Sequence, residues 1–334
     1  MILILTDQFD THADKVINYF KENNTPFFRL DLDVEALKKT IISFNGSTWT
    51  IQQNDIKIST SLIKAVWLRR AFVELTLEEM KYQENDFKIW KNEWNKTLNG
   101  LYLSLKQKIW LNPVDKAYKG ENKYYQMELA KKIGFEVPDT LISNNKEDLL
   151  SFSKKYKKVV FKLMTQEFYA DDKGNYQGLF VNIINENHLN KFNEIEENPI
   201  VLQKYIEKSF EVRYTIVGDK HFVCKIDSQN SNKTKVDWRR YDIPNTPHYQ
   251  IMPPDIIREK VTLLLKTMEL NYGALDFVVT EKNEWIFLEI NCLGQWLWIE
   301  DLTGMPISNE IGSWYRQKLS ETEKEVIYNE SIRN

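Results

Sequence analysis

The segment 272–291 reads YGALDFVVTEKNEWIFLEIN, two strand-like runs separated by the polar residues 281–284. This pattern predicts an antiparallel hairpin. If residues 281–284 form the loop, Asp276 lies directly opposite Glu289 on the neighbouring strand. Asn291 follows two residues later and, because side chains alternate along a strand, it shares a face with both carboxylates. The hairpin is therefore expected to present three oxygen donors on one patch.

The other face of this hairpin is apolar. Ile286, Leu288 and Ile290 alternate with the polar residues and are expected to face a core. Two carboxylates directly opposite each other would repel in a bare sheet, whereas a divalent cation is stabilised by oxygen ligands. Magnesium also shares its ligand sphere with nucleotide phosphates. The pattern favours a magnesium site, and the alternative is a solvated hairpin face with no ligand.

Basic residues elsewhere in the chain are placed to meet an anion. Lys162 stands inside the apolar run 159–163, where an unpaired ammonium is costly, so we expect an anionic partner such as a nucleotide phosphate. A lysine reaching out from a strand edge is the alternative. Glu211 and Arg213 are spaced two apart on a predicted strand, and Arg239 and Arg240 lie in a polar loop. These arginines are candidates for binding phosphates or carboxylates.

The chain before this region alternates strands with helices, which predicts an α/β or α+β class. It opens as a βαβ unit, followed by a hairpin marked by the pair Asn45-Gly46 and by a strand that ends in Arg69-Arg70. The two arginines could bind acidic substrate groups, and the alternative is a surface pair or an interface salt bridge. We expect three domains, at residues 1–115, 116–199 and 200–334.

Composition excludes several classes of protein. The 334 residues include 45 Lys and Arg against 48 Asp and Glu, a formal net charge of −3, so a nucleic-acid-binding protein held by bulk charge is not expected. Two cysteines without a CxxC pair indicate neither a disulfide framework nor a structural zinc site. The N-terminal apolar run is too short for a signal peptide or a membrane span, so we expect a cytoplasmic location.

These motifs, in this order, resemble those of the ATP-grasp ligases. The superfamily resemblance covers the whole chain and rests on Glu121-Asn122-Lys123, Val159-Val160-Phe161-Lys162, the run 201–206, Glu211-x-Arg213, and Asp276 with Glu289 and Asn291. Within that superfamily the chain is similar to the graspetide maturases of the microviridin and grasp-with-spasm types. The narrower resemblance rests on residues 2–7 with 28–31, 66–70, 111–113 with 121–123 and 137–140, and 294–300.

The resemblance implies an ATP-grasp fold: an N-terminal α/β pre-ATP-grasp domain, a central small α+β domain and a C-terminal antiparallel-sheet domain. It also implies a role for each matching residue. Lys123 and Lys162 would contact the ATP phosphates, and Arg213 would neutralise a phosphate or acyl phosphate, with Arg239 and Arg240 as further catalytic cations. The adenine edge would be held by the backbone of Gln203, Lys204, Tyr205 and Ile206. Glu211 would bind the ribose, and Asp276, Glu289 and Asn291 would bind two magnesium ions.

One segment departs from the ATP-grasp pattern. Many ATP-grasp enzymes cover the phosphates with a compact glycine-rich loop, whereas residues 165–178 are longer, acidic and aromatic. This departure puts the expected phosphate-loop contacts in doubt. The resemblance implies that Phe168, Tyr169, Asp171 and Asp172 dock a leader peptide instead, and an ordinary surface loop is the alternative.

The resemblance implies an ATP- and magnesium-dependent ligase for a ribosomally made precursor peptide. Such enzymes activate Asp or Glu side chains as acyl phosphates and close rings as esters with Thr or Ser, or as amides with Lys. Similar enzymes are homodimers. Two alternatives remain: an ATP-grasp carboxylate-amine ligase acting on amino acids or a protein C-terminus, and a nucleotide-binding regulatory module without turnover.

Overall fold

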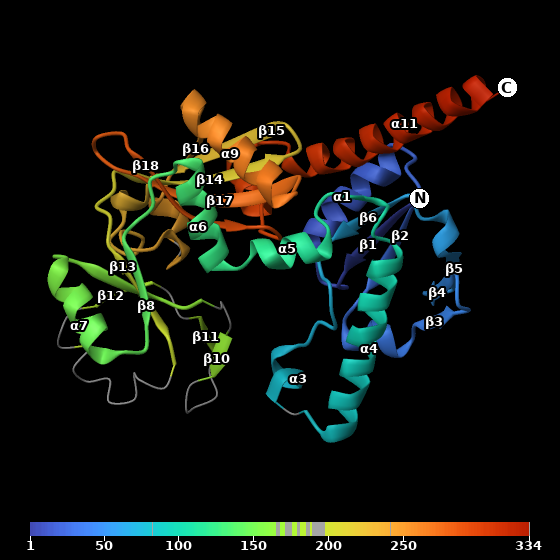
Figure 1. Ribbon diagram of the computed structural model, residues 1–334, viewed down its shortest axis with the longest axis horizontal. Helices are drawn as coiled ribbons and strands as arrows, with labels where there is room; N and C mark the ends of the chain where they lie inside the picture. The colour runs from blue at the N-terminus through green and yellow to red at the C-terminus, as the bar shows by residue number, and fades with distance from the viewer. Residues whose placement is uncertain are drawn as a thin grey trace.

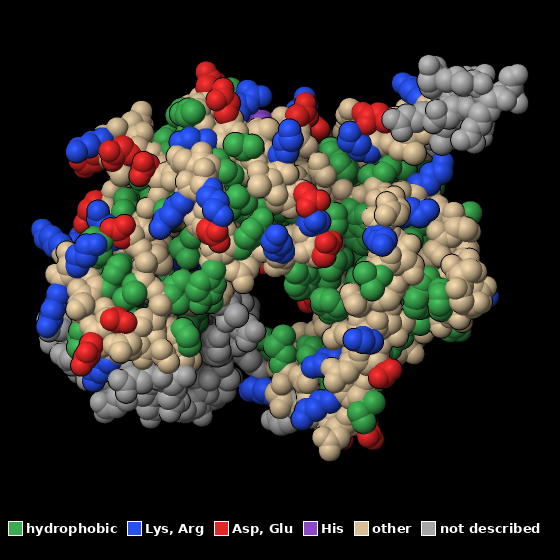
Figure 2. Space-filling view, viewed as in Figure 1, with side chains coloured by type: hydrophobic (Ala, Val, Ile, Leu, Met, Phe, Trp, Pro, Cys, Tyr) green, Lys and Arg blue, Asp and Glu red, His purple; other side chains and the backbone are tan. Residues whose placement is uncertain are grey.

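The computed structural model describes residues 1–81, 83–164, 168–170, 176–178, 181–184, 188, 198–240 and 242–333. Three groups of elements surround a central opening (Figure 1). The space-filling view shows that this face is hollowed between the lobe at the lower left and helices at the lower right, with hydrophobic side chains along the rim (Figure 2). No helix in the described ranges has the length and apolar character needed to cross a bilayer.

The first group of elements contains a parallel sheet in the order β2-β1-β6-β7, with a three-stranded antiparallel sheet, β3-β4-β5, beside it. All five residues of β1 are buried, as expected for a strand covered on both faces. The elements are β1 (Ile2–Thr6), α1 (Thr11–Glu22), β2 (Phe27–Asp31), α2 (Val34–Lys38), β3 (Ile41–Phe44), β4 (Trp49–Gln53), β5 (Ile56–Ser59), β6 (Ala65–Leu68), α3 (Leu77–Lys81), α4 (Asn85–Ser104) and β7 (Ile109–Trp110). The predicted Asn-Gly hairpin is confirmed as β3–β4.

The second group forms a four-stranded antiparallel sheet in the order β12-β9-β13-β8. Its elements are α5 (Val114–Gly120), α6 (Lys123–Ile133), β8 (Thr140–Ser143), α7 (Lys146–Lys155), β9 (Val159–Lys162), β10 (Phe168–Ala170), β11 (Tyr176–Gly178), β12 (Asn182–Ile184) and β13 (Ile200–Lys204). Strands β10 and β11 form a separate antiparallel pair. The sequence also favours a short helix near residues 189–195, and these residues lie outside the described part of the chain.

The sequence favours a helix over residues 121–133 with Gly134 as its stop; α6 begins two residues later, at Lys123, and ends at the expected glycine. The Asn122 side chain caps it by accepting from the N–H groups of Tyr124 and Tyr125, and Gly134 ends it with φ at +92°. Lys123 therefore sits in the first turn. The sequence did not predict the short helix α5, which precedes it.

The third group is a five-stranded sheet in the order β16-β15-β14-β17-β18. Its elements are β14 (Phe210–Val217), β15 (Lys220–Ile226), β16 (His248–Gln250), α9 (Asp255–Met268), β17 (Tyr272–Val279), β18 (Trp285–Asn291), α10 (Leu297–Thr303) and α11 (Ile307–Arg333). Helix α11 packs against α1, so the last helix joins this sheet to the first group (Figure 1). The α/β class is confirmed.

Candidate active site

Three charged residues stand in a row across neighbouring strands of the five-stranded sheet. Arg213 on β14 pairs with Asp276 on β17, and Asp276 pairs with Glu289 on β18. The sequence-derived pairing of Asp276 with Glu289 is therefore found in the structure. The sheet alone aligns an arginine and two carboxylates, because directly opposed residues on adjacent strands project on the same face.

The hairpin reaches this pairing by a route that the sequence did not reveal. At the loop, Val279 pairs with Trp285, so the register starts one residue away from the expected one. A β-bulge beside Asp276 then admits one extra residue, Leu288, and restores the pairing of Asp276 with Glu289. The expected loop of residues 281–284 was therefore one residue too short.

The bulge also changes which side chains of β18 face the core. Trp285, Phe287 and Ile290 are buried in the hydrophobic core, whereas Leu288 lines the cavity beside Glu289. The expectation that Ile286, Leu288 and Ile290 share the core face is wrong except for Ile290. An extra residue in a strand reverses the alternation of side chains on either side of it.

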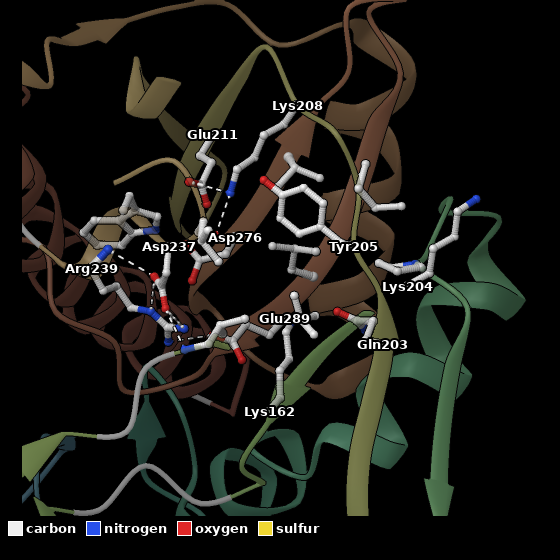
Figure 3. Close-up of a pocket in the computed structure, with 18 residues that line it drawn as sticks. Lys162, Gln203, Lys204, Tyr205, Lys208, Glu211, Asp237, Arg239, Asp276 and Glu289 are labelled. Atoms are coloured by element: carbon white, nitrogen blue, oxygen red, sulfur yellow. Dashed lines mark hydrogen bonds and ion pairs between the residues drawn. The ribbon is translucent and has the colours of Figure 1, made fainter. Parts of the chain in front are cut away.

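A cavity of about 580 Å³ separates this row from the four-stranded sheet (Figure 3). Several predicted residues line it: Lys162, Gln203, Lys204, Tyr205, Ile206, Glu211, Arg239, Asp276 and Glu289. Residues from β9, β13, β14, β17 and β18 thus meet although they are spread over more than a hundred positions of the chain. Apolar side chains, among them Val160, Val278 and Leu288, complete the wall.

Asp276 and Arg213 form a buried ion pair. The Arg213 Nε lies 2.9 Å from Asp276 Oδ1, yet neither atom has a well-aligned hydrogen bond within the described part of the chain. Burial raises the pKa of Asp276, and the guanidinium of Arg213 opposes this shift. A buried carboxylate with an unsatisfied oxygen is suited to accept a further cation.

Glu289 meets cations from three other elements. Its Oε2 lies 2.9 Å from Lys123 Nζ, and its Oε1 lies 3.7 Å from Arg239 Nη1. Burial raises the pKa of Glu289, but Lys123, Arg239 and Lys162 more than offset it, so the pKa of Glu289 falls below its ordinary value. Burial lowers the pKa of Lys162 to about 8, although Glu289 partly opposes this shift. Positively charged side chains therefore gather at the cavity, and a bound polyanion would stabilise their charged forms.

The segment from Gln203 to Ile206 follows β13 along one wall of the cavity (Figure 3). The N–H of Lys204 donates to Asp139 O at 2.8 Å, and the N–H of Tyr205 donates to Lys158 O at 3.0 Å. These two N–H groups are used within the protein. The N–H groups of Lys204 and Tyr205 are therefore not available for the expected contact with an adenine edge, which would use other backbone groups of this segment.

Two charged residues of the cavity wall, Lys208 and Asp237, were not predicted from the sequence. Lys208 Nζ lies 2.8 Å from Glu211 Oε1, and both side chains are buried. Burial raises the pKa of Glu211, with Lys208 opposing. Asp237 holds Arg239 through two hydrogen bonds of 2.9 Å. The spacings Lys208-x-x-Glu211 and Asp237-x-Arg239 are the only signals that the sequence offers for these residues, and both occur widely on surfaces.

The remaining predicted residues are placed around the cavity or outside the description. Asn291 lies two residues beyond Glu289, with its Nδ2 3.4 Å from Ala274 O. Arg240 points to β12, where it donates to Val181 O and Asn182 Oδ1. The backbone of Phe168 and Tyr169 belongs to β10, and Asp171 and Asp172 lie outside the described residues. Among the described residues, no three His, Cys, Asp or Glu side chains gather as metal ligands.

The paired arginines 69 and 70 are both engaged within the protein. Arg69 is buried against Asp10 at 3.0 Å and also donates to Leu293 O. Arg70 lies 2.9 Å from Asp7 Oδ2. Each of the two arginines thus forms an ion pair with an aspartate of the same chain.

Comparison with solved structures finds a RiPP-associated ATP-grasp ligase from Chryseobacterium gregarium, solved in complex with ADP and a leader and core peptide. The two chains are 31% identical, the match covers 95% of this chain and 96% of that chain, and the TM-score is 0.85. The chain belongs to the RiPP-associated ATP-grasp ligases. RiPP denotes ribosomally synthesised and post-translationally modified peptides. The predicted ATP-grasp fold is confirmed.

Other matches of this ATP-grasp ligase agree. The family described as the MvdD pre-ATP grasp domain matches residues 1–118. The macrocyclase MdnC from Microcystis aeruginosa MRC, bound with precursor peptide MdnA, is 27% identical over 93% of this chain and 98% of that chain, with a TM-score of 0.82. The macrocyclase MdnB of the same organism is 25% identical over 94% and 98%, with a TM-score of 0.77. No curated protein matches the chain.

Proposed function

We propose that this ligase uses ATP and magnesium to activate Asp or Glu side chains of a ribosomally made precursor peptide and to close macrocyclic ester or amide links. The observation that carries the proposal is that Asp276 and Glu289 line the same cavity as Lys162 and Arg239, with Arg213 paired to Asp276 on the neighbouring strand. This arrangement offers both cations for phosphates and carboxylates for metal ions. Related structures hold ADP with a leader and core peptide, or a precursor peptide.

The nucleotide is assigned to the cavity between the two sheets. Lys123 and Lys162 would contact its phosphates, the segment from Gln203 to Ile206 its adenine, and Glu211 its ribose. Lys162 supports this assignment, because burial disfavours its charge and a phosphate would stabilise that charge.

The oxygen donors fit a magnesium site. Asp276 and Glu289 are opposed, Asn291 lies on the same face, and the Asp276 Oδ1 lacks a well-aligned hydrogen bond among the described residues. We propose that these three residues bind two magnesium ions together with the phosphates. When bound, magnesium would neutralise charge on the transferring phosphoryl group. No chain residue needs to form a covalent bond with the substrate.

The reaction has two steps. A substrate carboxylate oxygen attacks the γ-phosphorus, ADP leaves, and an acyl phosphate forms. A hydroxyl or amine then attacks the acyl carbon, phosphate leaves, and the nucleophile gives up its proton. Arg213 and Arg239 flank the two carboxylates, so their fixed positive charge can stabilise the phosphate and the acyl phosphate without reorganisation.

The precursor is assigned to the hollow that Figure 2 shows between the central lobe and the α3–α4 side. The paired strands β10 and β11 lie on the side of the four-stranded sheet that is turned towards α3 in Figure 1, which supports leader docking at residues 168–172. Deleting these residues should weaken precursor binding and spare ADP binding. An unchanged precursor affinity would contradict this docking site.

Mass spectrometry of a precursor co-expressed with the enzyme tests the function, because each condensation removes one water. The candidate precursor is a short reading frame, adjacent in the genome, rich in Thr and Asp or Glu, or Lys. An unchanged precursor mass with ATP turnover on amino acids or a protein C-terminus would favour the carboxylate-amine ligase. Nucleotide binding without any turnover would favour the regulatory module. We further propose a homodimer, which light scattering of the purified protein would test.

A further inference from the structure

Residues 235–240 connect the two sheets that enclose the cavity. The segment lies in the loop between β15 and β16, and both of these strands belong to the five-stranded sheet. Trp238–Arg240 form a short 3₁₀ turn at its end. We call residues 235–240 the bridging segment. It contacts the opposite sheet at two places, beside β12 and just after β13.

The first set of contacts ties the bridging segment to β12. The N–H of Val181, which directly precedes β12, donates to Asp237 Oδ2 at 3.3 Å. The Arg240 Nη2 donates to Val181 O at 3.0 Å and to Asn182 Oδ1 at 2.7 Å. Val181, next to β12, thus forms hydrogen bonds to the bridging segment through both its N–H and its carbonyl group.

The second set ties the same segment to the residues that follow β13. The hydroxyl of Tyr205 donates to Lys235 O at 3.2 Å, and Lys208 Nζ donates to Val236 O at 3.0 Å. Lys208 also forms the buried ion pair with Glu211. The bridging segment is therefore anchored on both sides of the cavity.

Asp237 joins these anchors to the charged row. It is 4% exposed, and it accepts from Arg239 Nε, Arg239 Nη2 and the Arg239 N–H at 2.9, 2.9 and 3.1 Å. Burial raises the pKa of Asp237, but Arg239 more than offsets this, so the carboxyl stays ionised. The same carboxylate accepts from Val181. A bidentate carboxylate fixes the plane of a guanidinium, and here Arg239 Nη1 points to Glu289 at 3.7 Å.

We propose that Asp237 is a positioning residue: it fixes Arg239 over the phosphate region only while the β12 side of the central sheet is closed on the bridging segment. Arg240 is the tether that holds this closed arrangement, through Val181 and Asn182. This assignment rests on the proposed function, since it takes the cavity as the nucleotide site. Because Asp237 acts through Arg239, its removal adds nothing once Arg239 is gone.

A double-mutant cycle tests the positioning role. Asp237→Asn keeps the shape of the side chain and should lower kcat by about 10- to 100-fold, with a smaller change in KM for ATP, because a misplaced cation loses transition-state stabilisation. The double variant Asp237→Asn with Arg239→Gln should be no slower than Arg239→Gln alone. Multiplicative losses in the double variant would overturn the assignment. Asp219→Asn, an exposed change in the turn before β15, is the matched control and should leave kcat unchanged.

Release of a fluorescent ADP analogue with magnesium tests the tether without any turnover. Arg240→Gln should speed release by about 10-fold, because the bonds to Val181 and Asn182 are lost, while Asp219→Asn should release at the wild-type rate. Wild-type release rates in Arg240→Gln would overturn the tether. A wild-type protein that binds no ADP would instead refute the proposed function, and this inference with it.

Discussion

Buried polar groups occur in two regions of this ligase, and they are satisfied in different ways. At the junction where the parallel sheet meets the end of β18, each of the polar side chains considered below has a complete set of aligned hydrogen bonds. In and beside the cavity, Glu211, Arg213 and Asp276 lie against opposite charges without such alignment, whereas Asp237 and Arg239 are well aligned. The difference separates polar groups that hold the fold from groups that are suited to a ligand.

Asn112 shows the junction side of this comparison. Its Oδ1 accepts from the N–H groups of Asn271 and Tyr272, and its Nδ2 donates to the carbonyls of Tyr272 and Cys292, all within 3.0 Å. Gln126 likewise donates to Gly120 O and Ile290 O and accepts from the Ile290 N–H. Asn112 has no remaining capacity for a ligand, and both donors of Gln126 are used.

The cavity shows the opposite. Glu211 Oε1, Arg213 Nε and Asp276 Oδ1 are all buried and lack a well-aligned hydrogen bond within the described residues, although each lies within 3.0 Å of an opposite charge. Such groups cost free energy in the protein alone. A nucleotide with its cations would supply the missing partners, which is a physical reason to place function here.

Glu289→Gln should produce the largest effect, because it removes a carboxylate from the proposed metal site without changing its size. We expect ligation to fall on the order of 10³-fold. The free energy of unfolding should fall as well, because Glu289 is buried and its loss leaves the ammonium of Lys123 without its ion-pair partner. Kinetics by mass spectrometry and urea denaturation of the same sample measure both quantities. A loss of stability with retained activity would mean that Glu289 holds the fold and does not serve a ligand, contrary to the difference drawn between the two regions.

Asn112→Ala should produce the next largest effect, on stability. It strands the N–H of Tyr272 and the carbonyls of Tyr272 and Cys292 at a buried junction, while the N–H of Asn271 keeps its bond to Leu111 O. We expect a loss of about 3 kcal/mol in the free energy of unfolding. Urea denaturation monitored by tryptophan fluorescence gives the value. Asn99→Ala on the exposed face of α4 is the matched control. Equal stability of the two variants would show that the junction network does not hold the fold.

Acid should weaken the junction through Asp10, by a smaller amount. Burial raises the pKa of Asp10, but Arg69 and the Thr6 hydroxyl more than offset it and lower the pKa to about 2. The unfolded chain titrates near the ordinary value of 3.8, so this contribution, about 2 kcal/mol, is present above pH 4 and is lost as the pH falls towards 2.

Comparing the wild type with Asp10→Asn by urea denaturation at several pH values isolates this contribution. The stability difference between the two proteins should shrink between pH 4 and pH 2. A difference that stays constant over this range would mean that Asp10 does not titrate with a lowered pKa.

Much of the site could be predicted because it depends on local order. Strand alternation placed Asp276, Glu289 and Asn291 on one face, and Gly134 marked the end of the helix that carries Lys123. The resemblance then selected Lys162 and the segment from Gln203 to Ile206, which do line the cavity. Their roles remain proposals.

Other features could not be predicted because they arise only between distant segments. Leu288 lines the cavity because a bulge interrupts β18, and the sequence carries no glycine or other marker of a bulge at that point. Lys208 and Asp237 become important only when the loop between β15 and β16 lies against the residues after β13.

The sequence by itself determined the alternation of strands and helices, the carboxylates of the last hairpin and the ATP-grasp resemblance, since these depend on spacing along the chain. The tertiary structure alone decided which charges are neutralised. Arg69 is buried against Asp10, Arg240 binds beside β12, and Arg239 is held by Asp237 beside Glu289. Ion pairing depends on distance and burial, and neither is set until the sheets have packed.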